Sequence, residues 1–256
     1  MSFKKNVFVF KTGNEATEAL LTWWESKTQA FANDHQPVSW ALSGGKTPLG
    51  FYKKLAQSQS IDWQQIQAFL VDERDVDLDQ PDSNYRLCME AGLGERLRPE
   101  QFPAMRLSSL HSRAGVHYEQ TLCQLSHSRL DLVLLGMGGD GHTASLFPGT
   151  AEANRSVTLP FSDQEPLVLA HELPFQPLPQ LSSKWRITLT YKALSQAQEV
   201  AFLITGQDKA KRLHEIFFTD SDLPCAKVEK FRLQLGLATY WYLDEAAASL
   251  LEYKDL

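Results

Sequence analysis

Short apolar runs alternate with helical patterns along most of this chain of 256 residues, and this alternation constrains the fold more than any other feature. Apolar runs that predict strands lie at residues 38–42, 66–71, 132–135, 167–170, 187–190, 200–205 and 239–243. Apolar residues at helical spacing predict helices at residues 12–31, from Pro48 onward, at 207–218 and at 245–251. Buried strands that alternate with helices pair in parallel, because each helix supplies a crossover. We therefore predict the α/β class, with a mostly parallel, Rossmann-like sheet flanked by helices.

The least regular part of the chain, residues 150–184, is rich in proline and predicts a loop with one strand. This stretch is too short to form a domain of its own. We therefore expect residues 1–256 to form a single domain, with room for a small helical subdomain around residues 81–124. Trp23 and Trp24 lie on the apolar stripe of the first helix and are expected in the core.

The charge of the chain limits its partners. It carries 25 Lys and Arg residues against 31 Asp and Glu residues, a net charge of −6. Proteins that bind nucleic acid or anionic membranes collect positive charge, so neither partner is expected. An anionic small molecule is compatible with this charge if Lys, Arg and backbone N–H groups gather around it.

Cysteine usage and hydropathy indicate a cytoplasmic protein. Three cysteines at wide spacing, without a C-x-x-C pair, form neither a disulfide framework nor a cysteine metal site. No stretch is apolar enough for a signal peptide or a membrane span. The chain also has no H-E-x-x-H motif for a metal and no G-x-S-x-G elbow for a serine hydrolase. Without a heptad pattern or an exposed apolar helix, a monomer is favoured.

A glycine-rich loop follows the strand predicted at residues 38–42 and precedes a helix. Its residues are Ser43, Gly44, Gly45, Lys46 and Thr47. Glycine lets the backbone approach a ligand closely, and the start of a helix offers free N–H groups and the positive end of a dipole. With two hydroxyls and one ammonium group, the loop forms a candidate phosphate cradle, although it is not a Walker A motif. The alternative is a tight turn in which Ser43 and Thr47 only cap the helix.

Three charged residues, Asp72, Glu73 and Arg74, follow the strand predicted at residues 66–71. Ligands of parallel sheets bind outside the carboxyl ends of the strands, where Arg74 could hold a phosphate or an oxyanion. A solvated loop with a local ion pair is the alternative. Arg186 and Lys209 are further candidate clamps for an anion, although each is more often a surface charge when considered alone.

The most informative segment lies after the strand predicted at residues 132–135. Gly136, Gly138 and Gly141 match G-x-G-x-x-G, but Pro148 stops the long helix that a dinucleotide fold requires. The same loop carries Asp140 and His142. A histidine exchanges protons near neutral pH, and an aspartate two residues away can orient it. Glycine N–H groups could stabilise an oxyanion. The segment therefore indicates acid/base catalysis, against the alternative of a histidine that caps or packs at a helix start.

In chain order, these segments resemble those of the 6-phosphogluconolactonases. The matching segments are Ser43-Gly44-Gly45 with Thr47-Pro48, Asp72-Glu73-Arg74 with Ser83-Asn84, Leu135 to Gly138 with Asp140 to Gly149, Arg186 with Thr188, and Gly206 with Lys209. Two positions depart from the usual pattern of that family. Lys46 stands where a small serine is common, and Gly139 stands where proline is common.

This resemblance implies an α/β fold similar to that of the sugar-phosphate isomerases and deaminases, with no metal or organic cofactor. It implies hydrolysis of a sugar-phosphate lactone, 6-phosphoglucono-1,5-lactone, in the second step of the oxidative pentose phosphate pathway. It assigns acid/base chemistry to His142, which we expect Asp140 to orient. Substrate binding falls to Ser43, Gly44, Gly45, Lys46, Thr47, Arg74, Arg186 and Lys209. The alternatives are a glucosamine-6-phosphate deaminase and a sugar-phosphate sensor without catalysis.

Overall fold

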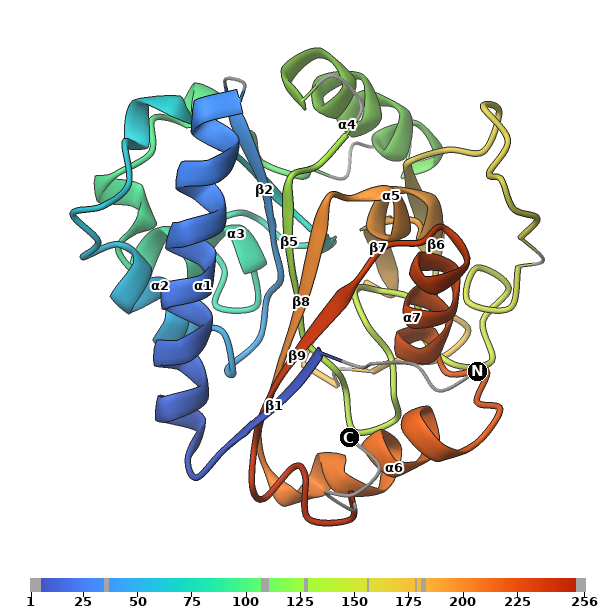
Figure 1. Cartoon of the computed structure of the whole chain (residues 1–256). Helices are drawn as coiled ribbons and strands as arrows, with labels where there is room; N and C mark the ends of the chain where they lie inside the picture. The colour runs from blue at the N-terminus through green and yellow to red at the C-terminus, as the bar shows by residue number, and fades with distance from the viewer. Residues whose placement is uncertain are drawn as a thin grey trace.

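Six parallel strands form the central sheet of the molecule (Figure 1). The computed structural model describes residues 6–34, 37–106, 111–126, 129–155, 157–177, 179–180 and 183–251. The order of the strands in the sheet is β1-β9-β8-β5-β2-β3, and every neighbouring pair is parallel. The strands are β1 (Asn6–Phe10), β2 (Val38–Leu42), β3 (Ile66–Leu70), β5 (Leu132–Leu135), β8 (Glu199–Ile204) and β9 (Thr239–Asp244). The predicted α/β class with a parallel sheet is confirmed.

Helices cover both faces of this sheet. They are α1 (Gly13–Asp34), α2 (Leu49–Leu55), α3 (Asn84–Glu90), α4 (His111–Ser126), α5 (Tyr191–Gln196), α6 (Ala210–Phe218) and α7 (Pro224–Gln234). In Figure 1, α1 and α2 lie on one side of the sheet and α5 and α7 on the other. The helix predicted at residues 207–218 is a 3-10 turn, Gln207–Lys209, followed by α6. The region around residues 81–124 is helical, as expected, with α3 and α4 inside it.

A second, smaller sheet has three antiparallel strands in the order β4-β7-β6. They are β4 (Asp72–Arg74), β7 (Trp185–Leu189) and β6 (Val168–Glu172). Val71 joins the two sheets, because its N–H donates to Leu42 of β2 and its carbonyl accepts from Leu189 of β7. The charged residues after β3 are therefore a strand of the second sheet and not the solvated loop considered as an alternative.

The chain changes direction across the sheet between β2 and β5. After β2 it proceeds outward to β3, whereas β5 lies on the other side of β2 and leads on to β8 and β9. Open α/β sheets bind ligands where the strand order reverses, outside the carboxyl ends of the strands. The loops at this position are residues 43–48 after β2 and residues 136–149 after β5, which are the two glycine-rich segments of the sequence.

A reciprocal hydrogen-bond pair fixes β2 against β5 at the opposite end of these strands. The N–H of Ser39 donates to Asp131 Oδ2 at 2.8 Å, and the N–H of Asp131 donates to Ser39 Oγ at 3.0 Å. Both side chains are buried, with exposures of 1% and 4%. A buried carboxylate is stabilised only when donors surround it, so this pair forms in a single register of the two strands.

The core contains Trp24 and Trp40 without solvent exposure, whereas Trp23 lies at its edge.

The prediction of a helix at residues 245–251 is wrong, because residues 245–250 form turns. The side chain of Asp244 accepts the N–H of Ala247 in these turns, and so short a helical pattern depends on packing and not on propensity. The sequence pattern did not predict β1, β4, α5 or α7.

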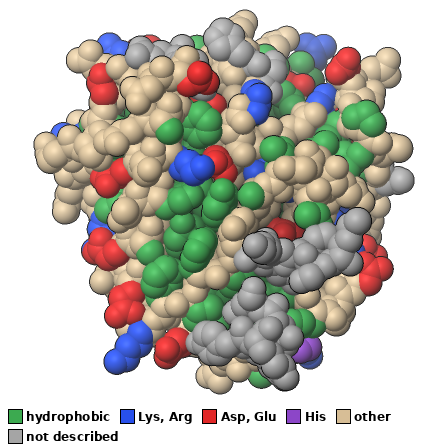
Figure 2. Space-filling view, viewed as in Figure 1, with side chains coloured by type: hydrophobic (Ala, Val, Ile, Leu, Met, Phe, Trp, Pro, Cys, Tyr) green, Lys and Arg blue, Asp and Glu red, His purple; other side chains and the backbone are tan. Residues whose placement is uncertain are grey.

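Hydrophobic side chains gather on the face of the molecule where β9 and β1 lie (Figure 1 and Figure 2). The ring of Tyr242 lies 5.3 Å from that of Phe8 and 6.3 Å from that of Phe10, between ring centroids. Phe8 is 41% exposed.

Among the described helices, none is long and apolar enough to cross a membrane.

Candidate active site

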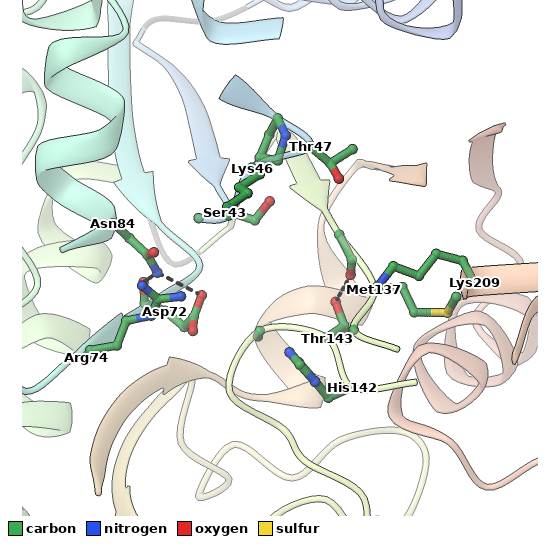
Figure 3. Close-up of a pocket in the computed structure, with 16 residues that line it drawn as sticks. Ser43, Lys46, Thr47, Asp72, Arg74, Asn84, Met137, His142, Thr143 and Lys209 are labelled. Carbon is green, nitrogen blue, oxygen red and sulfur yellow. Dashed lines mark hydrogen bonds between the residues drawn. The ribbon is translucent and has the colours of Figure 1, made fainter. Parts of the chain in front are cut away.

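A cavity of about 310 Å³ opens at the carboxyl ends of β2 and β5 (Figure 3). It is the meeting point of segments that lie far apart in the sequence. Its lining residues are Ser43, Gly44, Gly45, Lys46, Thr47, Pro48, Asp72, Arg74, Asn84, Gly136, Met137, Gly138, His142, Thr143, Ala144 and Lys209. In Figure 3, Ser43, Lys46 and Thr47 face His142 across the cavity, with Arg74 on one side and Lys209 on the other. Most of the predicted site residues are thus brought together.

A buried side chain of α2 fixes the loop of residues 43–47, and the Ser43 hydroxyl of the loop stays available for a ligand. The hydroxyl of Tyr52 donates to the carbonyl of Ser43 at 2.6 Å. Gly45 has φ +97°, a conformation that favours glycine. The residue at the start of α2 is Pro48, and no side chain caps this end of the helix. Ser43 Oγ is buried without a partner among the described residues. The alternative role of Ser43 and Thr47 as caps is therefore wrong.

The three residues of β4 do not all face the cavity. Asp72 and Arg74 line the cavity, and Arg74 also donates to the carbonyl of Asp82 at 2.6 Å. Glu73 points the other way and is 1% exposed. Its carboxylate accepts from the N–H groups of Asn84, Tyr85 and Arg74 and from the hydroxyl of Ser83. Glu73 thus fixes the start of α3, and with it the Asn84 side chain in the cavity wall.

His142 and Asp140, the candidate acid/base pair, lie side by side and are hydrogen-bonded. The Nδ1 atom of His142 lies 2.6 Å from Asp140 Oδ1, which also accepts the backbone N–H of His142 at 3.1 Å. Burial raises the pKa of Asp140, but the hydrogen bonds and the charge of His142 outweigh it, so the pKa lies below its ordinary value. The ring of His142 packs on Phe147 at 4.2 Å between centroids. No helix follows His142, so the alternative of a helix-capping histidine is wrong.

Lys209 and Arg186 differ in their access to the cavity. Lys209 lines it and pairs with Asp208 at 2.8 Å. Arg186 is 2% exposed, does not line the cavity and lies directly opposite Arg74 in the β4–β7 pair. Burial and the charge of Arg74 lower the pKa of Arg186. Its Nη2 atom is buried without a partner among the described residues. Its contact with a phosphate stays a prediction.

Asp72 and Asn84 are among the lining residues that the sequence did not predict as site residues. The Nδ2 atom of Asn84 donates to the Asp72 carbonyl at 2.8 Å, shown as a dashed line in Figure 3. Asp72 directly follows a buried strand, and the rule that ligands gather at such ends could have selected it. Asn84 belongs to the Ser83-Asn84 segment that matches the family pattern, and that match could have selected it.

Comparison with known proteins agrees with this geometry. The model of the glucosamine-6-phosphate isomerase/6-phosphogluconolactonase family matches residues 11–239. The chain belongs to this family. A curated 6-phosphogluconolactonase of Aggregatibacter actinomycetemcomitans is 32% identical, and the alignment covers 96% of this chain and 100% of that protein.

Solved structures show the fold of the family in this chain. The 6-phosphogluconolactonase of Trypanosoma brucei superposes with a TM-score of 0.80 at 27% identity, covering 98% of this chain and 100% of the other. A monomeric glucosamine-6-phosphate deaminase superposes with a TM-score of 0.76 at 20% identity, covering 96% and 99%. At that identity, the likeness to the deaminase shows the fold alone.

Proposed function

We propose that this protein hydrolyses 6-phosphoglucono-1,5-lactone to 6-phosphogluconate. The observation that carries the proposal is the position of the His142–Asp140 pair, which faces a glycine-rich loop and three cationic side chains across one cavity. The lactone needs an acid/base group at its carbonyl and an anion site at its phosphate. The cavity offers both, and family members similar over nearly the full chain are named for this activity.

His142 is the proposed base. The Asp140 carboxylate only accepts hydrogen bonds, so the proton of a neutral imidazole lies on Nδ1 and the lone pair lies on Nε2. Nε2 then takes a proton from water as the water attacks the lactone carbonyl. The C1–O5 bond breaks as the tetrahedral intermediate collapses, and protonated His142 returns its proton to the departing ring oxygen.

The oxyanion of the intermediate needs donors that are in place before the reaction begins. Among the described residues, no acceptor takes the backbone N–H of Ala144, which lines the cavity beside His142. This N–H group, with neighbouring N–H groups of the loop or an arginine, is the proposed donor. Asp140 keeps the imidazole in the required tautomer throughout.

The phosphate is the proposed ligand of residues 43–47, Arg74 and Lys209, with Arg186 adding charge behind Arg74. Backbone N–H groups and hydroxyls of the loop donate to phosphate oxygens, and the cations neutralise the dianion. Binding energy from this remote group positions the carbonyl near His142, so the phosphate contributes to the rate as well as to the affinity.

We further propose a cytoplasmic monomer that acts on a small molecule and binds neither nucleic acid nor membranes. The three cysteines, Cys88, Cys123 and Cys225, are unpaired thiols, which suits a reducing compartment. Light scattering after size exclusion tests the oligomeric state.

The test is NMR of freshly made 6-phosphoglucono-1,5-lactone at pH 6.5 with native protein and with His142→Ala. Hydrolysis proportional to native protein is expected, and the substitution should lower kcat by ~10²–10⁴-fold. His117→Ala, at an exposed position of α4, is the matched control. A loss below tenfold in His142→Ala would remove His142 as the base. Without any hydrolysis, release of ammonia from glucosamine 6-phosphate would identify a deaminase, and tight binding without turnover a sensor.

A further inference from the structure

All three polar groups of Ser145 are bound, and each is bound by a different strand of the small sheet. The hydroxyl donates to Asp72 Oδ2 of β4 at 2.6 Å. The N–H donates to Thr188 Oγ1 of β7 at 3.2 Å, and the carbonyl accepts from His171 Nε2 of β6 at 3.0 Å. Ser145 is 1% exposed, and it does not line the cavity. These bonds therefore hold the chain and leave no group of Ser145 for a ligand.

The residue before Ser145 is held in a rare conformation. Ala144 has φ +51° and is the only described residue other than glycine with a positive φ. A side chain makes this region unfavourable, so surrounding contacts must enforce it, and such residues gather at functional sites. Ala144 lines the cavity next to Thr143 and close to His142. The bonds to the adjacent Ser145 are the nearest contacts that can enforce the conformation of Ala144.

The partners of Ser145 are themselves fixed. The hydroxyl of Thr188 donates to the Leu189 carbonyl at 3.0 Å, so its oxygen is oriented to accept from Ser145. Asp72 is further held by Asn84. The Ser145 carbonyl only accepts, so the Nε2 atom of His171 carries a proton; the Nδ1 atom of the same ring lies 3.2 Å from Glu152 Oε2. Thr188 and Asp72 are thus held in place by further hydrogen bonds.

We propose that Ser145 is a positioning residue for lactone hydrolysis, through which the three-stranded sheet fixes the cavity wall formed by His142, Thr143 and Ala144. This inference rests on the proposed function. The small sheet contributes one hydrogen bond per strand to a single residue beside the catalytic histidine. Misplacement of a catalytic group by about 1 Å can cost ~10²-fold in rate, which is the scale of the effect at stake.

The first test compares Ser145→Ala with Ser195→Ala. Both serines are buried, but Ser195 Oγ has no partner among the described residues and lies outside the cavity lining. Ser145→Ala should lower kcat by ~10–100-fold with little change in KM, because the phosphate contacts remain. Ser195→Ala should keep both constants. A purely structural role would instead lower the melting temperature and leave kcat per folded molecule unchanged.

The second test asks whether Ser145 acts through Ala144 or through Asp72. Glycine adopts positive φ without a steric penalty, so Ala144→Gly removes the need for enforcement. The double variant Ser145→Ala with Ala144→Gly should therefore recover part of the kcat that Ser145→Ala loses. A double variant as slow as Ser145→Ala would overturn the link through Ala144.

The third test addresses the carbonyl of Ser145. His171→Gln keeps an N–H donor for that carbonyl, whereas His171→Leu does not, so His171→Gln should retain more kcat than His171→Leu. Hydrogen exchange of residues 141–146 should quicken in Ser145→Ala and in His171→Leu. A native chain without lactonase activity overturns the proposed function, and with it the positioning role of Ser145. An active native chain whose Ser145→Ala variant keeps its kcat overturns the role of Ser145 alone.

Discussion

A Cβ atom on Gly138 would lie 2.2 Å from the ring of His142, so the imidazole occupies the space that a side chain at position 138 would need. Phe147 packs on the same ring, and Asp140 binds its Nδ1 atom. The orientation of the His142 ring therefore depends on the absence of one side chain as much as on the presence of two others.

Gly138→Ala should displace the His142 ring and lower kcat by ~10²-fold, because a shift of this size removes Nε2 from the reacting water. KM should change little, since the phosphate contacts lie across the cavity. Steady-state kinetics with the lactone provides the measurement. Gly50→Ala is the control, because a Cβ there meets no atom within 4 Å. Equal kcat in the two variants would contradict the packing argument.

Gly44 and Asn84 form a similar pair on the phosphate side. A Cβ on Gly44 would lie 1.8 Å from Asn84 Oδ1, and Asn84 cannot turn away without losing its bond to Asp72. Gly44→Ala should therefore raise KM at least tenfold by shifting the loop, on the order of 1.4 kcal/mol. Adding Asn84→Ala should recover part of the loss. A double-mutant cycle of KM and thermal stability measures this coupling, and simple additivity would refute it.

The Asp140–His142 pair predicts a pH dependence of stability. The folded pKa of Asp140 is lowered, so its contribution is complete above the unfolded pKa of ~3.9 and is lost as the pH falls through the lower folded value. The difference in free energy of unfolding between native protein and Asp140→Asn should be largest above about pH 5 and should shrink as the pH falls below ~3.9. Because Asp140 is half-exposed, the difference should stay below about 1 kcal/mol. Urea titrations across this range give the result.

Lys46 lies exposed at the rim of the cavity. An exposed cation contributes at most about 1 kcal/mol, and salt screens it. Lys46→Ser should therefore raise KM by no more than about fivefold at low ionic strength, with kcat unchanged. The KM values of the two proteins should converge as salt is added. A salt-independent difference would point to a steric role for Lys46.

Arg232 is fully buried and has no part in the site. Its guanidinium donates to the carbonyls of Ser195, Ala197, Gln198 and Ala238. Arg232→Leu leaves these carbonyls without a donor and should lower the free energy of unfolding by ~3–5 kcal/mol. Chemical denaturation measures this loss. Arg212→Leu, on the half-exposed side of α6, should cost under about 0.5 kcal/mol.

The sequence was most informative where one pattern had one physical solution. The strands at residues 38–42 and 132–135 are mostly apolar and are buried on both faces, as expected in the middle of a sheet with helices on both sides. Residues 136–142 and 43–47 each combine glycines with polar residues after such a strand. Both loops are present in the cavity, together with Arg74 and Lys209.

Structure that depends on contacts with residues far away in the sequence could not be predicted in this way. β1 has the short apolar pattern NVFVF, and it becomes a strand because β9, more than 200 residues later, lies beside it. The single domain over residues 1–256 stays a prediction. Glu73 looked like a surface charge, and its role at the start of α3 depends on four donors that only the fold assembles. Arg186 has the positive charge expected of an anion site, but β7 places it opposite Arg74 and outside the cavity lining.

The Ser39–Asp131 pair, through the register of β2 and β5, determines the distance between the two loops that follow these strands. A strand rises by about 3.3 Å per residue, so a slip of one residue between β2 and β5 would move the phosphate loop by that distance relative to the His142 loop. A substrate of fixed length between its phosphate and its carbonyl could not then reach both loops. Two residues at the far end of the strands thereby match the spacing of the two loops to the dimensions of one sugar.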